Sequence, residues 1–399
     1  MSTSPQYISN KTTDFFIKAN KMWSIVGLSN LWIDNQYNQK RYRYVHNLIT
    51  LFIFILISSE LGALFTQSNL TEKQSNDLIL FTITHPILIS YYLALEYYNT
   101  KAKYLFIMLN VELKKAYNDL HVETRMIKRA TFFSFAYLLC LTIALGTYAF
   151  DSFVQVIRSE GSFTTVITAW PDVDNNTILA NLVRVINYIV WWALMLRVTA
   201  VSTFIIIASV SVSYQYKNLQ SYFYSLNDLF QLDANERDHK ENELKYVEAL
   251  KVGIRLHSDT LWCTKLCQVT CSLIVSGQII INISILCLLM LQLVASERTL
   301  MNAVTIVSTG IAVLTSTALL MLNAGDISYE AALVPTAMYS SGWQHCRGAI
   351  STKVRRLLVV AVMRGQEPVI FRSFGIIEIS YQSFVSIVKA SYSIFSLLY

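Results

Sequence analysis

The chain has 399 residues, of which 54% are hydrophobic and only 15% are charged, and it carries a formal net charge of +6. Soluble domains have about 25% charged residues, so this composition excludes an ordinary soluble domain and indicates a membrane protein. Gly and Pro are few and no internal repeat is visible, which predicts one membrane domain without flexible linkers. The polar start of the chain lacks the early apolar core of a cleavable signal peptide.

Seven apolar runs are long enough to cross a bilayer, whose hydrocarbon core of ~30 Å needs about 20 helical residues. The runs are 47–66, 78–97, 131–150, 182–210, 264–294, 301–323 and 374–398. The fourth and fifth are longer than a span requires, so we expect them to continue beyond the membrane as helix. Amphipathic patterns in 218–262 and 335–363 predict further helical extensions that could form a layer of contacts between subunits.

The basic residues are divided unevenly between the two sets of connections. Of the 32 Lys and Arg, 25 lie before the first run or in every second loop, and only three lie in the alternate loops. The positive-inside rule therefore places the N-terminus in the cytoplasm, and seven spans then place the C-terminus outside. The predicted divisions are a cytoplasmic segment 1–46, a six-helix bundle 47–323, a cytoplasmic anchor region 324–373 and a last helix 374–399.

Two N-glycosylation sequons, at Asn69 and Asn175, fall in the predicted outer loops and agree with this orientation. Chance matches are the alternative, since the sequence has two further sequons at positions unsuited to glycosylation. A metabotropic seven-span receptor would have the opposite topology. A secondary transporter would show repeats or interrupted helices. No catalytic constellation or phosphate-binding loop is visible, and the basic loops need no nucleic acid, so we expect neither an enzyme nor a cofactor.

The last 70 residues carry a recognisable pattern. Its elements are Tyr339 and Trp343; Arg355-Arg356-Leu357-Leu358; Arg364, Gln366 and Pro368; Ser383-Phe384; and Ser391-Tyr392-Ser393 with Leu397-Leu398. This pattern resembles the C-terminal signature of insect odorant receptors, a family of about this length with an inverted seven-span topology. The signature of the related gustatory receptors is absent.

The resemblance implies an odorant-binding subunit of a ligand-gated, non-selective cation channel. It would assemble with a shared co-receptor, as a tetramer, in the plasma membrane of olfactory sensory neurons. A small volatile odorant would open a pore lined by the last helix. A gustatory-type channel and a metabotropic receptor are the alternatives.

The last helix carries a polar stripe made of Gln382, Ser386, Lys389, Ser393 and Ser396. The 4-3-4-3 spacing puts these residues on one face, and polar groups that face lipid are costly. We therefore expect Ser386, Ser393 and Ser396 to line a pore. Leu397, which extends the stripe and matches the gate position of the family, would form an apolar gate. The alternative is that the serines bond to their own helix or to neighbouring helices, and the role of Lys389 is open.

The resemblance also implies a ligand pocket in the outer half of the bundle, among the second, third, fourth and sixth spans. Such pockets are concave, aromatic and lightly polar. The candidate lining residues are Phe81, Thr84, His85 and Leu88; Ile143, Gly146 and Phe150; Tyr188, Trp191, Trp192 and Met195; and Asn302, Thr305 and Ile306. The few polar groups predict a neutral ester, ketone or alcohol. Ordinary core packing or an interfacial aromatic belt is the alternative for the aromatic residues.

Other polar residues inside the runs have structural explanations. Arg197 needs a carboxylate or carbonyl partner in the fourth run, and Glu60 is a possible one. Cys263, Cys267 and Cys271 repeat every four residues on one helix face. With no His on that face, we interpret them as free buried cysteines and expect no metal site.

Overall fold

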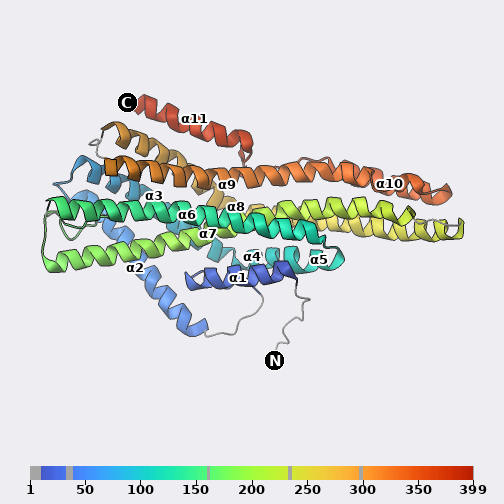
Figure 1. Cartoon of the computed structure of the whole chain (residues 1–399), viewed down its shortest axis with the longest axis horizontal. Coiled ribbons are helices and arrows are strands. Elements are labelled where there is room, and N and C mark those ends of the chain that lie inside the picture. Colours follow the sequence, from blue (N-terminus) through green and yellow to red (C-terminus); the bar gives the residue numbers. More distant parts are fainter. Residues whose placement is uncertain (1–9, 33–38, 160–161, 232–235, 296–299, 399) are drawn as a thin grey trace.

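The computed structural model describes residues 10–32, 39–159, 162–231, 236–295 and 300–398. It is helical almost throughout (Figure 1). The helices are α1 (Lys11–Ile25), α2 (Gln39–Thr66), α3 (Glu72–Tyr97), α4 (Asn99–Ile107), the π-helical turn η1 (Met108–Glu112), α5 (Leu113–Ala116), α6 (Leu120–Ser159), α7 (Ile178–Ser225), η2 (Leu226–Phe230), α8 (Glu236–Ala295), α9 (Leu300–Tyr339), η3 (Trp343–His345), α10 (Gly348–Gly365) and α11 (Tyr381–Leu398), with a two-stranded hairpin of β1 (Arg372–Ser373) and β2 (Ile377–Glu378).

Six of the predicted spans coincide with helices that are long and apolar enough to cross a membrane, namely α2, α3, α6, α7, α8 and α9, counted over the described residues. The seventh prediction coincides with α11, in which some of the last side chains lie outside the described part of the chain. α7 has 48 residues and α8 has 60. At ~1.5 Å per residue both are far longer than a bilayer is thick, as their sequences predict.

α7 lies at the centre of the bundle, where it packs against α6, α8 and α9 and also touches α2 and α3. Its residues from 197 to 216 are almost all buried. A helix that is apolar on every side is stable only when other helices surround it, and this segment has such a sequence. The long helices α6, α7, α8 and α9 run side by side along the molecule (Figure 1).

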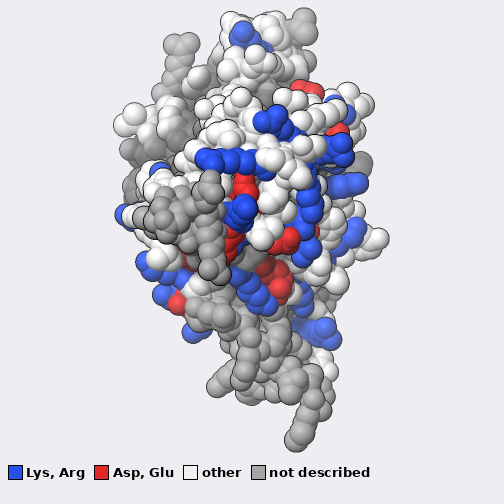
Figure 2. Space-filling model, turned by 90° about the vertical axis from the view of Figure 1, so that its right-hand side faces the viewer, with Lys and Arg blue, Asp and Glu red and all other residues white. Residues whose placement is uncertain are grey.

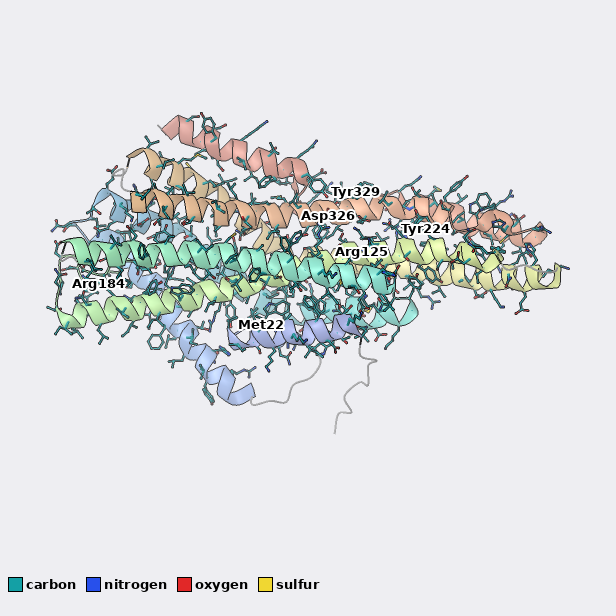
Figure 3. All side chains as sticks on the ribbon, viewed as in Figure 1. Met22, Arg125, Arg184, Tyr224, Asp326 and Tyr329 are labelled. Atoms are coloured by element: carbon teal, nitrogen blue, oxygen red, sulfur yellow. The ribbon has the colours of Figure 1, made fainter. Side chains whose placement is uncertain are left out.

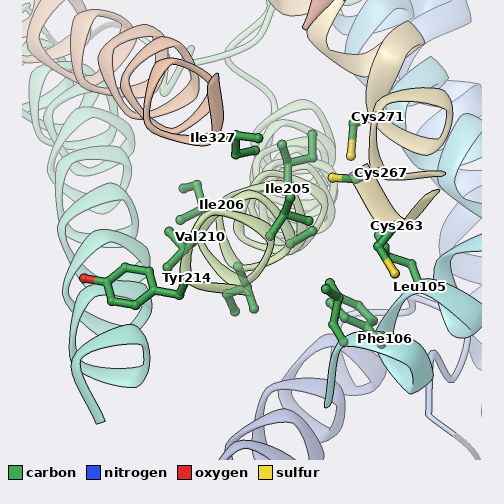
Figure 4. Close-up of a cluster of buried hydrophobic side chains, with 14 of the residues drawn as sticks. Leu105, Phe106, Ile205, Ile206, Val210, Tyr214, Cys263, Cys267, Cys271 and Ile327 are labelled. Atoms are coloured by element: carbon green, nitrogen blue, oxygen red, sulfur yellow. The ribbon is translucent and has the colours of Figure 1, made fainter. Parts of the chain in front are cut away.

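The three predicted core cysteines lie on the side of α8 that faces α7 and α4. Cys263, Cys267 and Cys271 are at most 2% exposed. They pack in the same cluster as Phe106 and Ile205 (Figure 4). Their thiols therefore fill space between helices, which is the usual role of a buried free cysteine.

The segment before the last helix differs from its prediction. Instead of helix from residue 374, the chain forms a hairpin in which Arg372 is paired with Glu378 and Ser373 with Ile377. Phe374 and Gly375 both have positive φ angles, 52° and 72°, and close the turn. The Phe374 amide donates to Ser276 Oγ on α8 at 3.0 Å. The last helix therefore begins only at Tyr381.

The two ends of the bundle have different character. The loops that carry Asn69 and Asn175 lie at one end, where Asn69 Nδ2 donates to a carboxylate oxygen of Asp174 at 3.2 Å, and the C-terminal end of α11 points the same way (Figure 1). α10, the C-terminal end of α7 and the first turns of α8 lie at the opposite end. Lys and Arg side chains are spread over that end (Figure 2). Asn69 is exposed and Asn175 is half-buried.

Candidate functional site

A cavity of about 120 Å³ lies inside the bundle, between α3, α6, α7, α8 and α9. Most of its lining is apolar. The lining residues are Leu80, Phe81, Thr84 and Leu88 on α3; Tyr137, Leu141, Ala144, Leu145 and Tyr148 on α6; Trp191, Met195 and Val198 on α7; Gln278, Ile281, Asn282 and Ile285 on α8; and Thr309, Ala312, Val313 and Ser316 on α9.

One wall of the cavity is aromatic and is built from three helices. The centroid of the Phe81 ring lies 5.4 Å from that of Trp191 and 5.8 Å from that of Tyr148. Tyr148 and Trp191 meet edge to face with centroids 5.8 Å apart. Such arrangements match the quadrupoles of the rings and add to the energy of simple burial. This wall presents rigid ring surface to anything inside the cavity.

Behind this wall lies a buried chain of polar groups. His85 Nδ1 is 2.8 Å and 2.9 Å from the two carboxylate oxygens of Glu60 on α2. The Trp191 indole N–H donates to His85 Nε2 at 3.0 Å. The His85 ring stacks on Phe81, with centroids 4.9 Å apart and an interplanar angle of 8°. α2 is thus connected through α3 to the wall residue on α7.

The opposite side of the cavity is polar and is supplied by α8 and α9. Gln278 Nε2 donates to Asn282 Oδ1 at 3.0 Å and to Ser316 Oγ at 3.1 Å. Asn282 Nδ2 donates to Thr317 Oγ1 at 2.5 Å. Amide and hydroxyl groups that line a largely apolar cavity can orient a ligand that carries one or two polar atoms.

The predicted pocket residues are distributed unevenly around this cavity. Phe81, Thr84, Leu88, Trp191 and Met195 line it. His85 is fully buried behind the aromatic wall. Tyr188 packs beside Trp191, with ring centroids 6.0 Å apart, and Trp192 packs beside Tyr188, with ring centroids 6.3 Å apart. Trp191 is only 1% exposed, which excludes an interfacial-belt position for this residue.

The residues predicted on α6 do not line this cavity. Ile143 and Phe150 are 51% and 55% exposed. A Cβ added at Gly146 would meet no atom within 4 Å. The cavity face of α6 is instead formed by Leu141, Ala144, Leu145 and Tyr148. Both faces are apolar, because one faces the cavity and the other is exposed to the surroundings of the bundle, so periodicity alone did not distinguish them.

The sixth span approaches the cavity one turn or more later than predicted. Thr305 and Ile306 are buried but lie outside the cavity lining. The side chain of Asn302 lies outside the described residues. α9 lines the cavity through Thr309, Ala312, Val313 and Ser316. The contribution of α8 was missed altogether, although Gln278 and Asn282 stand one helical turn apart in an apolar run, which is a signal of a shared polar face.

Arg197 finds carbonyl partners, whereas Glu60 was the wrong suggestion. The Arg197 guanidinium donates to Val26 O at 3.2 Å, to His46 O at 2.9 Å and to Thr50 Oγ1 at 2.6 Å. It also lies over the ring of Tyr92, 5.0 Å from the centroid. Glu60 is engaged by His85 instead. Arg197 thus fastens α7 to α2, α3 and the segment after α1.

The described part of α11 presents its polar stripe away from the bundle. Gln382, Ser386, Lys389, Ser393 and Ser396 are all exposed. Ile387 and Ser391 are buried, on the face that packs against α8 and α9. The contact face is narrow, since the neighbouring Val385 and Tyr392 are 50% and 62% exposed. The side chain of Leu397 lies outside the described residues.

The serine hydroxyls of the stripe also bond to their own helix. Ser386 Oγ donates to Gln382 O at 3.1 Å, and Ser393 Oγ donates to Lys389 O at 3.0 Å. These bonds satisfy the hydroxyl protons locally and leave oxygen lone pairs directed outward. Local bonding, the alternative considered for these serines, therefore coexists with an exposed polar face.

A family model shows the family of this chain, and solved structures show a similar fold. The model of the 7tm Odorant receptor family matches residues 106–392. The structure of the insect olfactory receptor OR5 from Machilis hrabei in complex with eugenol is similar, with a TM-score of 0.78 and 15% identity over 97% of this chain and 98% of that chain. A second structure of the insect olfactory receptor OR5 from Machilis hrabei has a TM-score of 0.76 and 15% identity, covering 97% of both chains. No curated protein matches the chain at a significant level. The family match extends over most of the sequence, and the chain belongs to the odorant receptor family.

Proposed function

We propose that this chain is the odorant-binding subunit of a ligand-gated, non-selective cation channel that assembles with a shared co-receptor subunit. The observation that carries the proposal is the aromatic cavity between α3, α6, α7, α8 and α9 in a member of the odorant receptor family. The solved structure of OR5 contains eugenol, a small neutral aromatic molecule, which makes this class of compound the starting point for ligands.

The size of the cavity indicates which ligands fit. Its volume of about 120 Å³ is close to that of an apolar cavity of ~150 Å³ that holds benzene. Burial of apolar surface contributes roughly 25 cal/mol per Å², so recognition of a small volatile molecule would rest mainly on burial and shape. A ketone, ester or alcohol could direct its polar atom toward Gln278, Asn282 or Thr309.

The same proposal assigns an ion path to the exposed face of α11. Ser386, Ser393 and Ser396 would face the water-filled axis of a tetramer, with Leu397 as the apolar gate. The polar stripe is exposed on the single chain, as a surface that meets water in an assembly must be. A ligand opens such a path only if it binds the open state more tightly than the closed state.

We also propose that the N-terminus is cytoplasmic, that Asn69 and Asn175 lie outside, and that the assembly resides in the plasma membrane of olfactory sensory neurons. The two sequon loops lie together at the end toward which the C-terminus points, and the basic end carrying α10 lies opposite. This arrangement agrees with the division of Lys and Arg along the sequence.

The function is tested by co-expression with a co-receptor subunit and by recording currents evoked by volatile esters, ketones, alcohols and small aromatics. Cation current that requires both subunits supports the proposal. Epitope tags on both termini, stained before and after permeabilisation, test the orientation. An extracellular N-terminus with a cytoplasmic C-terminus would favour a metabotropic receptor, and current evoked only by non-volatile tastants would favour a gustatory-type channel.

A further inference from the structure

Glu60, His85 and Trp191 form a continuous hydrogen-bonded chain that ends at the cavity wall. Glu60 and His85 are 0% exposed and Trp191 is 1% exposed. The three residues come from α2, α3 and α7, and Trp191 alone among them lines the cavity. Ionisable groups at this depth in a membrane protein are costly to bury, which makes them candidates for a specific role.

The chemistry of the donors fixes the direction of this chain. An indole N–H can only donate, so His85 Nε2 must accept from Trp191 at 3.0 Å. The imidazole proton is then on Nδ1, where it is donated to the Glu60 carboxylate at 2.8–2.9 Å. Glu60 therefore selects the tautomer that can accept from Trp191. His85 has neither nitrogen left for a ligand, although the sequence suggests it as a ligand donor.

The same imidazole also supports the second ring of the wall. It lies parallel to Phe81 with centroids 4.9 Å apart, and Phe81 is 5.4 Å from Trp191. Rotation of the Phe81 ring would disturb its contact with the imidazole, and rotation of the Trp191 indole would disturb its hydrogen bond to His85. Because the indole N–H is directed to His85 and away from the cavity, Trp191 offers a ligand its ring surface but not its hydrogen-bond donor.

We propose that Glu60 and His85 are positioning residues that determine ligand selectivity by holding Trp191 in one orientation and by withholding its N–H from the cavity. The inference rests on the proposed odorant site. Loss of the His85 acceptor leaves a buried indole N–H unsatisfied, and rotation of the indole about its second side-chain torsion would then bring this donor to a ligand acceptor. Selectivity would shift toward ligands that carry a carbonyl group.

Ethylbenzene and acetophenone provide a matched probe pair, because they share a skeleton and differ by one carbonyl oxygen. The dissociation constants of both are measured on the full chain in nanodiscs by tryptophan fluorescence, and their currents are recorded in co-receptor-expressing cells. His85→Phe is expected to raise the preference for acetophenone over ethylbenzene by about three- to tenfold, the value of one hydrogen bond. Trp191→Phe in the His85→Phe background should remove this shift.

Three further variants separate hydrogen bonding from shape. His85→Gln retains an acceptor for the indole and should keep the wild-type preference. Glu60→Gln retains an oxygen that accepts from His85 Nδ1 and should also keep the wild-type preference. Glu60→Met removes that acceptor and favours the other imidazole tautomer, so the preference should shift as in His85→Phe but by less. The indole N–H band in resonance Raman difference spectra against Trp191→Phe should move in His85→Phe and Glu60→Met only.

The outcomes distinguish this inference from the proposed function. If the wild type binds the probes without evoked current, the channel function fails while the binding preference still tests the inference. The positioning role is overturned if His85→Phe binds both probes with the wild-type ratio of dissociation constants. It is also overturned if adding Trp191→Phe to His85→Phe leaves the shift in preference intact. The odorant function stands in both cases. Absence of binding of both probes to the wild type would overturn the odorant site and the positioning role together.

Discussion

The Tyr381 hydroxyl donates a 2.5 Å hydrogen bond to a carboxylate oxygen of Asp326, and this bond joins the first turn of α11 to α9. The other carboxylate oxygen of Asp326 pairs with Arg129 on α6. Figure 3 labels Asp326 on α9. The Tyr381 ring lies directly over Gly325, where an added Cβ would be 2.9 Å from its Cζ atom. The start of the proposed pore helix is thus fixed to two long helices that also line the cavity.

Replacement of Gly325 by Ala should displace the first turn of α11. The new methyl group cannot fit at 2.9 Å, and the hydrogen bond to Asp326 limits how far the ring can move. Overpacking of this kind costs about 1–3 kcal/mol. We expect a lower thermal midpoint of the purified protein and a changed resting current in co-receptor-expressing cells.

Gly310→Ala on the same helix is the matched control, since its nearest contact would be Leu289 Cδ1 at 3.9 Å. It should leave both the thermal midpoint and the resting current at wild-type values. Equal behaviour of the two alanine variants would show that the contact between Tyr381 and Gly325 does not constrain α11.

Filling the cavity should weaken ligand binding without loss of the folded protein. Ala312 lines the cavity and is buried, so Ala312→Leu places three additional carbon atoms in a space of about 120 Å³. We expect at least about a tenfold loss of affinity for ligands of benzene size, with normal surface expression. Dose–response curves and surface biotinylation provide the two measurements.

Gly146→Ala adds a methyl group on the exposed face of α6 and serves as the control for the filled cavity. It should leave the order of ligand potencies unchanged. A changed order in Gly146→Ala together with an unchanged order in Ala312→Leu would move the ligand to the face of α6 that the sequence first suggested.

Two neighbouring serines of α11 should differ in accessibility. Ser393 is exposed on the polar stripe, and Ser391 is fully buried against the bundle. A positively charged thiosulfonate reagent should therefore inhibit the cation current of Ser393→Cys strongly and leave that of Ser391→Cys unaffected. If modification of Ser393→Cys is verified by mass spectrometry and the current persists, the stripe does not line the ion path.

Arg197 should be essential for assembly of the bundle. Its guanidinium satisfies two backbone carbonyls and Thr50 at once, and a lysine ammonium cannot reproduce this fork. Arg197→Lys should lower stability by roughly 1–3 kcal/mol, because buried carbonyl groups lose their donors. The thermal midpoint of the purified protein measures the effect. The exposed Arg255 offers the control, and Arg255→Lys should be neutral.

The sequence alone determined the number and order of the long apolar helices, the extension of α7 and α8 beyond a bilayer thickness, and the polar stripe of α11. These features depend on local composition and on the 3.6-residue period, which are properties of one segment at a time. The hairpin before Tyr381 was not predicted, because it depends on the contact of Phe374 with Ser276 on a distant helix.

Only the tertiary structure decided which apolar face of each helix meets the cavity and which buried charge meets which partner. In a membrane protein the outward faces are as apolar as the inward ones, so the hydrophobic pattern that orients a soluble helix carries little information for α6. The pairing of Glu60 with His85, and of Arg197 with the carbonyls of Val26 and His46, depends on packing between helices that no single segment encodes.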